Sequence, residues 1–450
     1  MSWKKIKLKQ ILKQYRIEHL VQNDIEYKQV TISKYDGVTF RGTKMGKEIG
    51  RKRQFKIDLK KYPNTLMFVR QGVQDGSIGI APLEVDGCIA TENMPMFSIE
   101  GINLEYLKFL LKSPYFYDEL NKIQTTGSAQ KSIHEREILE IEIPFPDIDE
   151  QEKIVKELSS KKDNSIAIST ELTHQLTLVK KLRHQLLQDA VQGKLVEQNP
   201  KDEPASELLK KIKAEKEKLI AEKKLKKEKE LPPIKPEEIP FEIPENWVWC
   251  RLGEITTLLT DGKHGDSKDQ KDSGYYFLSA KDIQNGKFIY DNARQITYED
   301  FIETHRRTNL EPGDLCVVNT GATIGKTAFA PDNELTRKTT FQKSVAILKV
   351  LNHHTSMRFI EYFIKFETPK LLKTSRGSAI NNLLLGDMKN VLFPMPPLKE
   401  QNRIVQKLDE LMQYCNELES SIKQSESQNE KLLQQVLREA LRKEPVGEEV

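Results

Sequence analysis

Residues 141–158 have the sequence IEIPFPDIDEQEKIVKEL, and residues 391–408 have the sequence VLFPMPPLKEQNRIVQKL. Pro144, Pro146, Glu150, Gln151, Ile154, Val155 and Leu158 recur 250 positions later as Pro394, Pro396, Glu400, Gln401, Ile404, Val405 and Leu408. An offset of 249 also aligns residues 66–82 with residues 315–331. A duplication of this length predicts a repeated globular domain, because solenoid repeats are far shorter.

Each copy of the repeated motif begins a long helix with a heptad pattern of apolar residues. Both helices are expected to be about 40–45 residues and roughly 60–68 Å long. A single exposed helix of this kind is unstable in water, so we expect the two seams to pack together as an antiparallel coiled coil, with dimerisation to a second subunit as the alternative. The predicted seam residues are Ile154, Leu158, Ile168, Leu172, Val179, Leu182 and Leu186 in the first helix, and Ile404, Leu408, Leu411, Cys415, Leu418, Ile422, Leu432 and Val436 in the second.

The two copies are joined by a charged segment followed by a proline-rich one. Residues 213–230 contain eight lysines and five glutamates, which is typical of a solvated helix, and four prolines follow between Pro232 and Pro240. Because proline cannot continue a helix, this segment is predicted to act mainly as a flexible connector. The predicted organisation is a first globular domain at 1–148, a first helix at 149–198, a linker at 199–245, a second globular domain at 246–398 and a second helix at 399–450.

The globular segments mix short β-type runs, such as residues 66–70, 315–320 and 344–350, with glycine-rich turns and helical stretches at 104–120 and 357–372. The predicted fold class is therefore α+β: two similar globular domains and two long helices, related by a pseudo-two-fold repeat. Trp3, Trp247 and Trp249 lie beside the first strand of each copy and are expected in the cores.

Composition excludes several classes of protein. The chain has 450 residues, 37% of them hydrophobic, and no run of eighteen apolar residues, so a membrane protein is not expected. Its start lacks the apolar segment of a secretory signal, which favours a cytoplasmic location. Four widely spaced cysteines indicate neither a zinc ribbon nor a disulfide framework. The net charge is only +4, but residues 41–61 hold nine basic side chains against two acidic ones.

Motifs for catalysis are not recognisable. Residues 321–327, GATIGKT, are one residue short of a phosphate-binding loop, and strand-like sequence follows them instead of a helix. The pair His353-His354 has no third ligand near it in sequence, so a surface position is the simpler interpretation and no metal site is predicted. No dinucleotide-binding fingerprint is present either. Coupled with the duplication, this pattern favours a binding protein without catalytic residues.

Five motifs, four of them from the second copy and one from the first, resemble the target recognition domains of type I restriction–modification specificity subunits. They are PENWVWCRLGEI (244–255), GDLCVVNTGATIGKTA (313–328), RGSAI (376–380), FPMPPLKEQNRIVQKLDEL (393–411) and, in the first copy, LLQDAVQGKLV (186–196). The resemblance covers nearly the whole chain. The first copy departs from it: Tyr62-Pro63-Asn64-Thr65 stands where Glu311-Pro312-Gly313-Asp314 stands in the second, so the two domains are expected to recognise different sequences.

The resemblance implies that each domain recognises one half of a bipartite, asymmetric target in double-stranded DNA, and that the paired helices set the gap between the halves. It also implies partners: two methylation subunits that bind S-adenosylmethionine, and restriction subunits that act as motor and nuclease with ATP and Mg²⁺. This chain itself is then expected to hold no cofactor and to catalyse nothing. The alternatives are a nuclease with an unrecognised active site, and a coiled-coil protein without DNA specificity.

Candidate DNA contacts follow from side-chain chemistry. Arg and Lys bind guanine edges or phosphates, and Asn and Gln bind adenine edges. In the first domain the candidates are Arg41, Lys44, Arg51, Arg53, Arg70, Gln71, Gln74, Ser128, Gln130 and Lys131. In the second domain they are Lys263, His264, Lys281, Arg307, Asn319, Thr323, Lys326, Arg376, Ser378 and Asn381. Arg70 and Asn319 occupy equivalent positions of the repeat.

Overall fold

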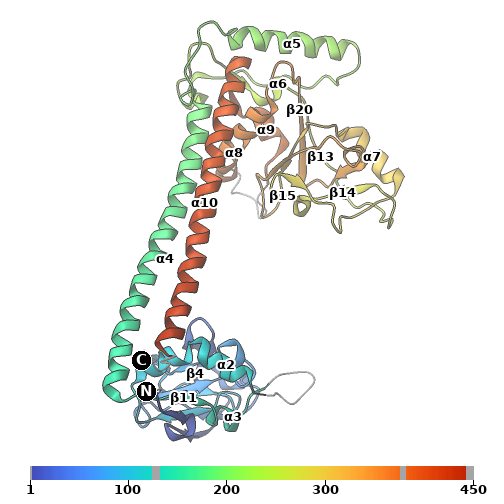
Figure 1. Cartoon of the computed structure of the whole chain (residues 1–450). Coiled ribbons are helices and arrows are strands. Elements are labelled where there is room, and N and C mark those ends of the chain that lie inside the picture. Colours follow the sequence, from blue (N-terminus) through green and yellow to red (C-terminus); the bar gives the residue numbers. More distant parts are fainter. Residues whose placement is uncertain (1–2, 124–131, 375–381, 442–450) are drawn as a thin grey trace. The chain divides into compact units, whose positions relative to one another are not determined.

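The computed structural model describes residues 3–123, 132–374 and 382–441 (Figure 1). The chain forms two compact units: unit 1 comprises residues 1–175 and 421–450, and unit 2 comprises residues 176–420. Each unit therefore contains one globular copy of the repeat together with a segment of each long helix.

Both units contain the same frame of strands. In unit 1, β1 (Lys5–Lys7) pairs antiparallel with β11 (Glu142–Pro144), and a four-stranded sheet has the order β2 (Leu12–Tyr15), β10 (Met96–Ile99), β7 (Thr65–Phe68) and β8 (Ile78–Ile80). In unit 2, β12 (Val248–Arg251) pairs antiparallel with β21 (Leu392–Met395), and the sheet order is β13 (Thr256–Asp261), β20 (Val345–Val350), β17 (Leu315–Val318) and β18 (Thr327–Phe329). The matching orders confirm the predicted α+β repeat.

Helices cover these frames. Unit 1 has α1 (Leu104–Leu111), α2 (Pro114–Asn121) and α3 (Glu135–Leu139), while unit 2 has α6 (Leu252–Ile255), α8 (Met357–Thr374) and α9 (Leu385–Asn390). The core of unit 1 is formed around Phe68, Phe97 and Tyr106, and the core of unit 2 around Phe359, Phe363 and Phe393. Of the tryptophans expected in the cores, Trp247 is buried, and Trp3 and Trp249 are half-buried.

The units differ in what is inserted into the four-stranded sheet, between its first and second strands along the chain and again before its last strand, β10 or β20. Unit 1 carries a five-stranded sheet in the order β3 (Glu18–Leu20), β6 (Arg53–Lys56), β9 (Ile89–Ala90), β4 (Glu26–Ser33) and β5 (Gly37–Met45). Unit 2 instead carries the parallel pair β14 (Tyr276–Leu278) and β19 (Thr339–Phe341), the hairpin of β15 (Ile283–Gln284) and β16 (Lys287–Phe288), and the helix α7 (Tyr298–Thr308).

The repeated glutamine of the EQ motif explains why the motif begins each long helix. Gln151 is 1% exposed; its Nε2 donates to the Pro146 carbonyl over 2.9 Å and its Oε1 accepts the Asn103 N–H over 2.8 Å. Gln401, buried equally well, donates to the Pro396 carbonyl over 2.9 Å and accepts the Ser356 N–H over 2.8 Å. Each amide thus satisfies two backbone groups in the interior and connects the long helix to the preceding frame.

The long helices are α4 (Ile148–Val191) and α10 (Leu398–Ala440), and they pair antiparallel in each unit (Figure 1). In unit 1, Ile154 and Leu158 pack with Leu437 and Leu441, while Asn429 Nδ2 donates to the Ser165 carbonyl (2.9 Å) and to Ser169 Oγ (3.0 Å). In unit 2, Ala190 belongs to the same core as Ile404 and Leu408, and Arg183 pairs with Glu419 over 2.9 Å.

One stripe of the predicted seam is confirmed, because Ile154, Leu158, Leu172, Val179, Ile404, Leu408, Cys415 and Ile422 are all buried. Leu186, Leu411 and Val436 are half-buried. The second stripe was predicted one position too early: Ile168, Leu182, Leu418 and Leu432 are 47%, 44%, 49% and 58% exposed. The helices contact each other one position later along the chain, as the ion pair between Arg183 and Glu419 shows. On a helix with 3.6 residues per turn, the apolar pattern is compatible with either of two adjacent stripes. The sequence also does not show whether a charged residue forms a partly buried ion pair or lies free at the surface.

The linker is not the flexible connector that its composition predicted. Helix α5 (Ala205–Ala221) inserts Ala205, Leu208 and Ile212 into the core of unit 2. Lys216 donates to the carbonyls of Gly253, Glu254 and Thr256 over 3.1, 3.0 and 2.7 Å, and burial lowers the pKa of this ammonium. The proline segment is held by the guanidinium of buried Arg251, which donates to the Pro232 and Pro233 carbonyls and pairs with Glu238. The sequence analysis missed this packing because the few apolar residues of the α5 face are surrounded by lysines, and the overall polarity of the segment indicated a solvated linker.

Candidate nucleic-acid interface

In unit 2, several loops that carry candidate residues meet at one short turn, residues 342–344, between β19 and β20. The Asn319 N–H donates to the Ser344 carbonyl over 3.0 Å, and the Ala280 N–H donates to Ser344 Oγ over 3.2 Å. The Lys343 N–H donates to the Lys263 carbonyl over 3.1 Å. The turn therefore brings together the loop after β17, the loop containing Lys281 and the loop after β13.

The loop after β13 is held by its own charged residues. Lys263 pairs with Asp300 and Glu303 on α7 over 2.7 and 2.8 Å, and its side chain is only 15% exposed. His264 Nε2 lies 2.8 Å from Asp261 Oδ2, and Arg307 donates to the Asp261 and Gly262 carbonyls. A Cβ at position 262 would lie 2.0 Å from the Phe341 carbonyl oxygen, so the close approach requires glycine. In the free protein, the side chains of these residues are used to hold the conformation of the loop.

In the loop after β17, Lys326 is exposed and Thr323 is half-buried, whereas Asn319 is 3% exposed. The Asn319 carbonyl accepts the Leu383 N–H over 2.8 Å, and Thr320 Oγ1 donates to Asn382 Oδ1 over 2.9 Å. Strand β18 follows the loop and pairs antiparallel with β17. A phosphate-binding loop would be followed by a helix at this point, whereas here a strand follows residues 321–327, as the sequence pattern predicted.

The exposed cations around the turn are Lys281, Lys326 and Lys343. Within the described ranges, no ion pair or side-chain hydrogen bond engages these three ammonium groups. Such free cations are suited to neutralise phosphates. Sequence reasoning missed Lys343, although the turn between two predicted strands was a signal that could have identified it.

The equivalent region of unit 1 has the same backbone and different charges. The Arg70 N–H donates to the Asn93 carbonyl over 3.0 Å and the Arg70 carbonyl accepts the Ile133 N–H over 2.9 Å, as Asn319 does with Ser344 and Leu383. The position of Lys343 is occupied here by Glu92, which is exposed.

The side chain of Arg70 is held by Glu135 through two hydrogen bonds, of 3.1 and 2.6 Å. Burial raises the pKa of Glu135, but the hydrogen bond from Arg70 and the further bonds outweigh this and leave the pKa below its usual value. Arg16 also lies 3.3 Å from the same carboxylate. Direct contact of Arg70 with a base would therefore compete with an internal ion pair.

The inserted sheet of unit 1 presents a second group of cations. Arg41 and Lys44 are exposed on β5, an edge strand of the sheet, and Arg51 is exposed just before β6. In the part of unit 1 that the structure describes, these three side chains have no ion-pair partner. Arg53 is exposed too, but pairs with Glu18.

The remaining candidates are placed as follows. Gln74 is half-buried and Gln71 is exposed in the loop after β7. Ser128, Gln130, Lys131, Arg376, Ser378 and Asn381 lie outside the described residues. The structure thus brings the second-domain candidates Lys263, Lys281, Thr323 and Lys326 together around one turn, and Arg41, Lys44, Arg51 and Arg53 onto the inserted sheet of unit 1.

The fold and this interface define a duplicated α+β protein whose two frames carry different, positively charged loop surfaces. The family described as the type I restriction modification DNA specificity domain matches residues 2–178 and 244–425. The chain belongs to this family.

Curated relatives are similar over most of the chain. It is 32% identical to the type I restriction enzyme EcoAI specificity subunit of Escherichia coli over 371 residues, which cover 72% of this chain and 62% of that protein. It is 25% identical to the EcoEI specificity subunit of the same organism, over 81% of this chain and 68% of that protein. The matched region thus spans less than two thirds of the EcoAI subunit.

Two solved structures share the fold. One comes from work on complex assembly and conformational transition of the type I R-M system, with a TM-score of 0.59, 18% identity and 98% coverage of both chains. The other is the HsdS subunit from Thermoanaerobacter tengcongensis, with a TM-score of 0.50, 17% identity, and coverage of 98% of this chain and 97% of that one. None of the helices in the described ranges could cross a membrane.

Proposed function

We propose that this chain is the specificity subunit of a type I restriction–modification enzyme and recognises a two-part, asymmetric sequence in double-stranded DNA. The observation that carries the proposal is the duplication itself: two copies of one specificity-domain family stand on matching frames and differ in their exposed loops. Two unlike surfaces on one chain are suited to two unlike half-sites.

Phosphate binding is assigned to the free cations. Arg41, Lys44 and Arg51 in the first copy, and Lys281, Lys326 and Lys343 in the second, are exposed. They can hold the DNA backbone in register, while the candidates Gln74 and Thr323 have the groups needed to bind base edges. Lys263 and Arg307 act indirectly in this proposal, because their pairing with Asp300 and Asp261 fixes the loop that the DNA meets.

The chemistry is proposed to reside on partner subunits. Two methylation subunits would bind S-adenosylmethionine, and restriction subunits would use ATP and Mg²⁺ as motor and nuclease. This chain would supply recognition and a scaffold, in the cytoplasm, and no catalytic residue.

The long helices offer a surface for such partners. Ile168 and Leu432 in unit 1, and Leu182, Tyr414 and Leu418 in unit 2, are between 44% and 58% exposed. Large apolar side chains repeated along a helix at this exposure are typical of a protein contact surface. We propose that the methylation subunits cover them. Replacing Leu182 and Leu418 together by Ser should then reduce co-purification of the methylation subunits, while the double variant Lys180→Ser/Gln413→Ser on exposed positions of the same helices should not.

The proposal is tested by co-expression with methylation subunits and mapping of methylated adenines in the host DNA. A single bipartite motif that disappears when this chain is omitted is the expected result. Lys326→Ala/Lys343→Ala should weaken methylation through the second copy, and Arg41→Ala/Lys44→Ala through the first. Methylation that proceeds equally well without this chain would overturn the proposal.

A further inference from the structure

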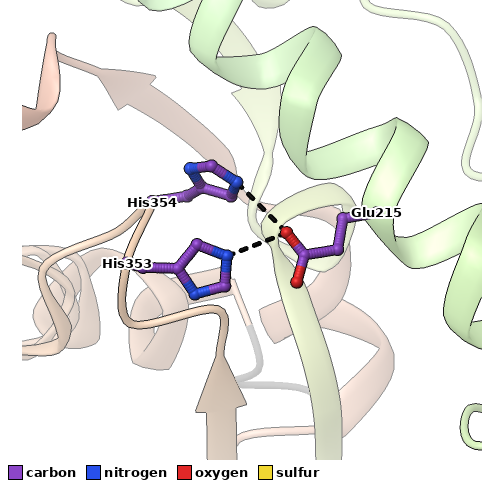
Figure 2. Close-up of side chains that lie close together, drawn as sticks. All are labelled: Glu215, His353 and His354. Atoms are coloured by element: carbon purple, nitrogen blue, oxygen red, sulfur yellow. Dashed lines mark hydrogen bonds and ion pairs between the residues drawn. The ribbon is translucent and has the colours of Figure 1, made fainter.

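Three side chains from two segments far apart in the sequence converge in unit 2. Glu215 comes from α5, and His353 and His354 come from the turn after β20 (Figure 2). Both imidazoles direct Nε2 at the same carboxylate atom: Glu215 Oε2 lies 2.8 Å from the Nε2 of His353 and 3.2 Å from that of His354. One potential ligand atom from each residue lies within 4.8 Å of the others.

Both backbones that carry these side chains are anchored. One turn before Glu215, Ile212 is buried in the core, and the adjacent Lys216 caps three carbonyls of the 253–256 segment. On the other side, the His354 N–H donates to the Leu351 carbonyl over 2.8 Å, and the Ser356 N–H donates to the buried amide of Gln401. The three ligands are therefore positioned by the fold, as a metal site requires.

The chemistry and spacing suit a zinc ion. Imidazole nitrogen and carboxylate oxygen are ordinary Zn²⁺ ligands at about 2.0–2.2 Å, which places neighbouring ligand atoms of a tetrahedron roughly 3.3–3.5 Å apart. The separations of 2.8 and 3.2 Å between the carboxylate oxygen and the two imidazole nitrogens need only a modest opening by side-chain rotation. Partial exposure of Glu215, His353 and His354, at 32%, 59% and 19%, leaves an entry path for an ion and room for water.

We propose that Glu215, His353 and His354 form a Zn²⁺ site that fastens the linker helix α5 to the second recognition domain. Two histidines and one glutamate would supply three ligands and leave a fourth position for water. The second half of α5 and the Lys/Glu-rich segment after it contribute few buried side chains, so a metal bridge at Glu215 would stabilise the part of the helix that packing holds least. The inference does not depend on the proposed function.

The alternative is a plain ion pair of one carboxylate with two imidazoles. The His264–Asp261 pair in the same unit shows what such a contact looks like: it has the same 2.8 Å separation but belongs to no three-ligand cluster among the residues that the structure describes. Metal binding therefore separates the two explanations, and geometry alone does not.

The experiment is calorimetric titration of the full chain, without a histidine tag, with Zn²⁺, followed by Co²⁺ absorption spectroscopy as a probe of coordination. The expected result is one equivalent of Zn²⁺ and a tetrahedral Co²⁺ spectrum that Zn²⁺ displaces. Glu215→Gln and His353→Asn should each weaken this binding by about 10- to 100-fold or more, since loss of even an outer-shell partner costs that much. His174→Asn, on the exposed face of α4, is the control and should bind as the parent chain does.

Hydrogen exchange supplies a second measurement on the same samples. Zn²⁺ should slow exchange of the backbone amides in residues 212–221 of the parent chain and of His174→Asn, but not of Glu215→Gln. If Zn²⁺ binds the parent chain and Glu215→Gln equally well, or does not bind the parent chain, the three residues form an ion pair and the proposal is wrong.

Discussion

The two copies of the repeat differ least where the chain is buried and most where it is exposed. The frames have matching strand orders, and Gln151 and Gln401 make the same two hydrogen bonds in the interior. The inserted elements differ in architecture: unit 1 has a five-stranded sheet, whereas unit 2 has two short strand pairs and the helix α7. The comparison indicates that the buried frame sets where the loops lie in each unit, whereas the inserted elements and the loops can differ in sequence and so present different surfaces.

Charge follows the same division. Around the turn before the last frame strand, unit 2 has exposed Lys343 where unit 1 has Glu92. In unit 1 the free cations lie on the inserted sheet instead, and the equivalent of Asn319 is an arginine already paired with Glu135. The two surfaces would therefore contact DNA through different elements of similar frames.

The sharpest test of the shared frame is truncation of its glutamine in either copy. Gln151→Ala and Gln401→Ala would each leave two interior backbone groups without a partner, at about 1–3 kcal/mol per group. We expect a similar loss of about 3 kcal/mol in both units, measured by hydrogen exchange of the adjacent frame strands. If one substitution costs little while the other unfolds its unit, the frames are not energetically equivalent.

The second test separates the two charged surfaces. In the complex with methylation subunits, Arg41→Ala/Lys44→Ala and Lys326→Ala/Lys343→Ala should each lower the slope of log affinity against log salt by about 2, because each cation that neutralises a phosphate contributes about 1 to that slope. The controls Lys108→Ala and Lys370→Ala remove exposed lysines that are paired with glutamates on helices. A slope that either double variant leaves at the parent value would exclude that surface from phosphate binding.

A smaller effect on stability is expected in the pair of long helices, where the two copies of the repeat differ at one buried position. Asn429 is buried at the position equivalent to Val179 and donates to Ser165 and Ser169. A buried polar residue in a coiled-coil seam fixes register at a cost in stability. Asn429→Val should therefore raise the unfolding free energy of the paired helices by about 1 kcal/mol or less. If urea denaturation showed a clear loss of stability in this variant, the hydrogen bonds of Asn429 would stabilise the helix pair and not only fix its register.

The smallest expected effect concerns the pair that only unit 1 possesses. Because the pKa of Glu135 is depressed in the folded chain, its stabilising contribution is present above the pKa of the unfolded chain and is lost as pH falls through the folded pKa. Unit 1 should lose this contribution in the acid range, and Glu135→Gln should remove that part of its pH dependence. Thermal unfolding followed between neutral and acid pH measures it, with Glu105→Gln, an exposed glutamate, as the control.

Much of the fold followed from particular residues. The PxPxxxEQ repeat located the start of both long helices, and the heptad pattern located one stripe of their contact. The second stripe was placed one residue early because Ile168 and Leu418 are apolar but exposed, whereas Arg183 and Glu419 are charged but paired. Of the candidate contacts, the sequence identified charged residues but not their internal partners, so Lys263 and Arg70 could not be distinguished from the free Lys326 and Arg41.

The sequence alone determined the duplication, the α+β class and the family, because an offset of 250 residues and apolar periodicity are one-dimensional properties. Only the tertiary structure decided which charges remain free, that α5 belongs to the core of unit 2, and that Glu215 lies beside His353, 138 residues away, and the adjacent His354. These facts depend on contacts between segments distant in sequence, and such contacts form only when burial and hydrogen bonding bring those segments together.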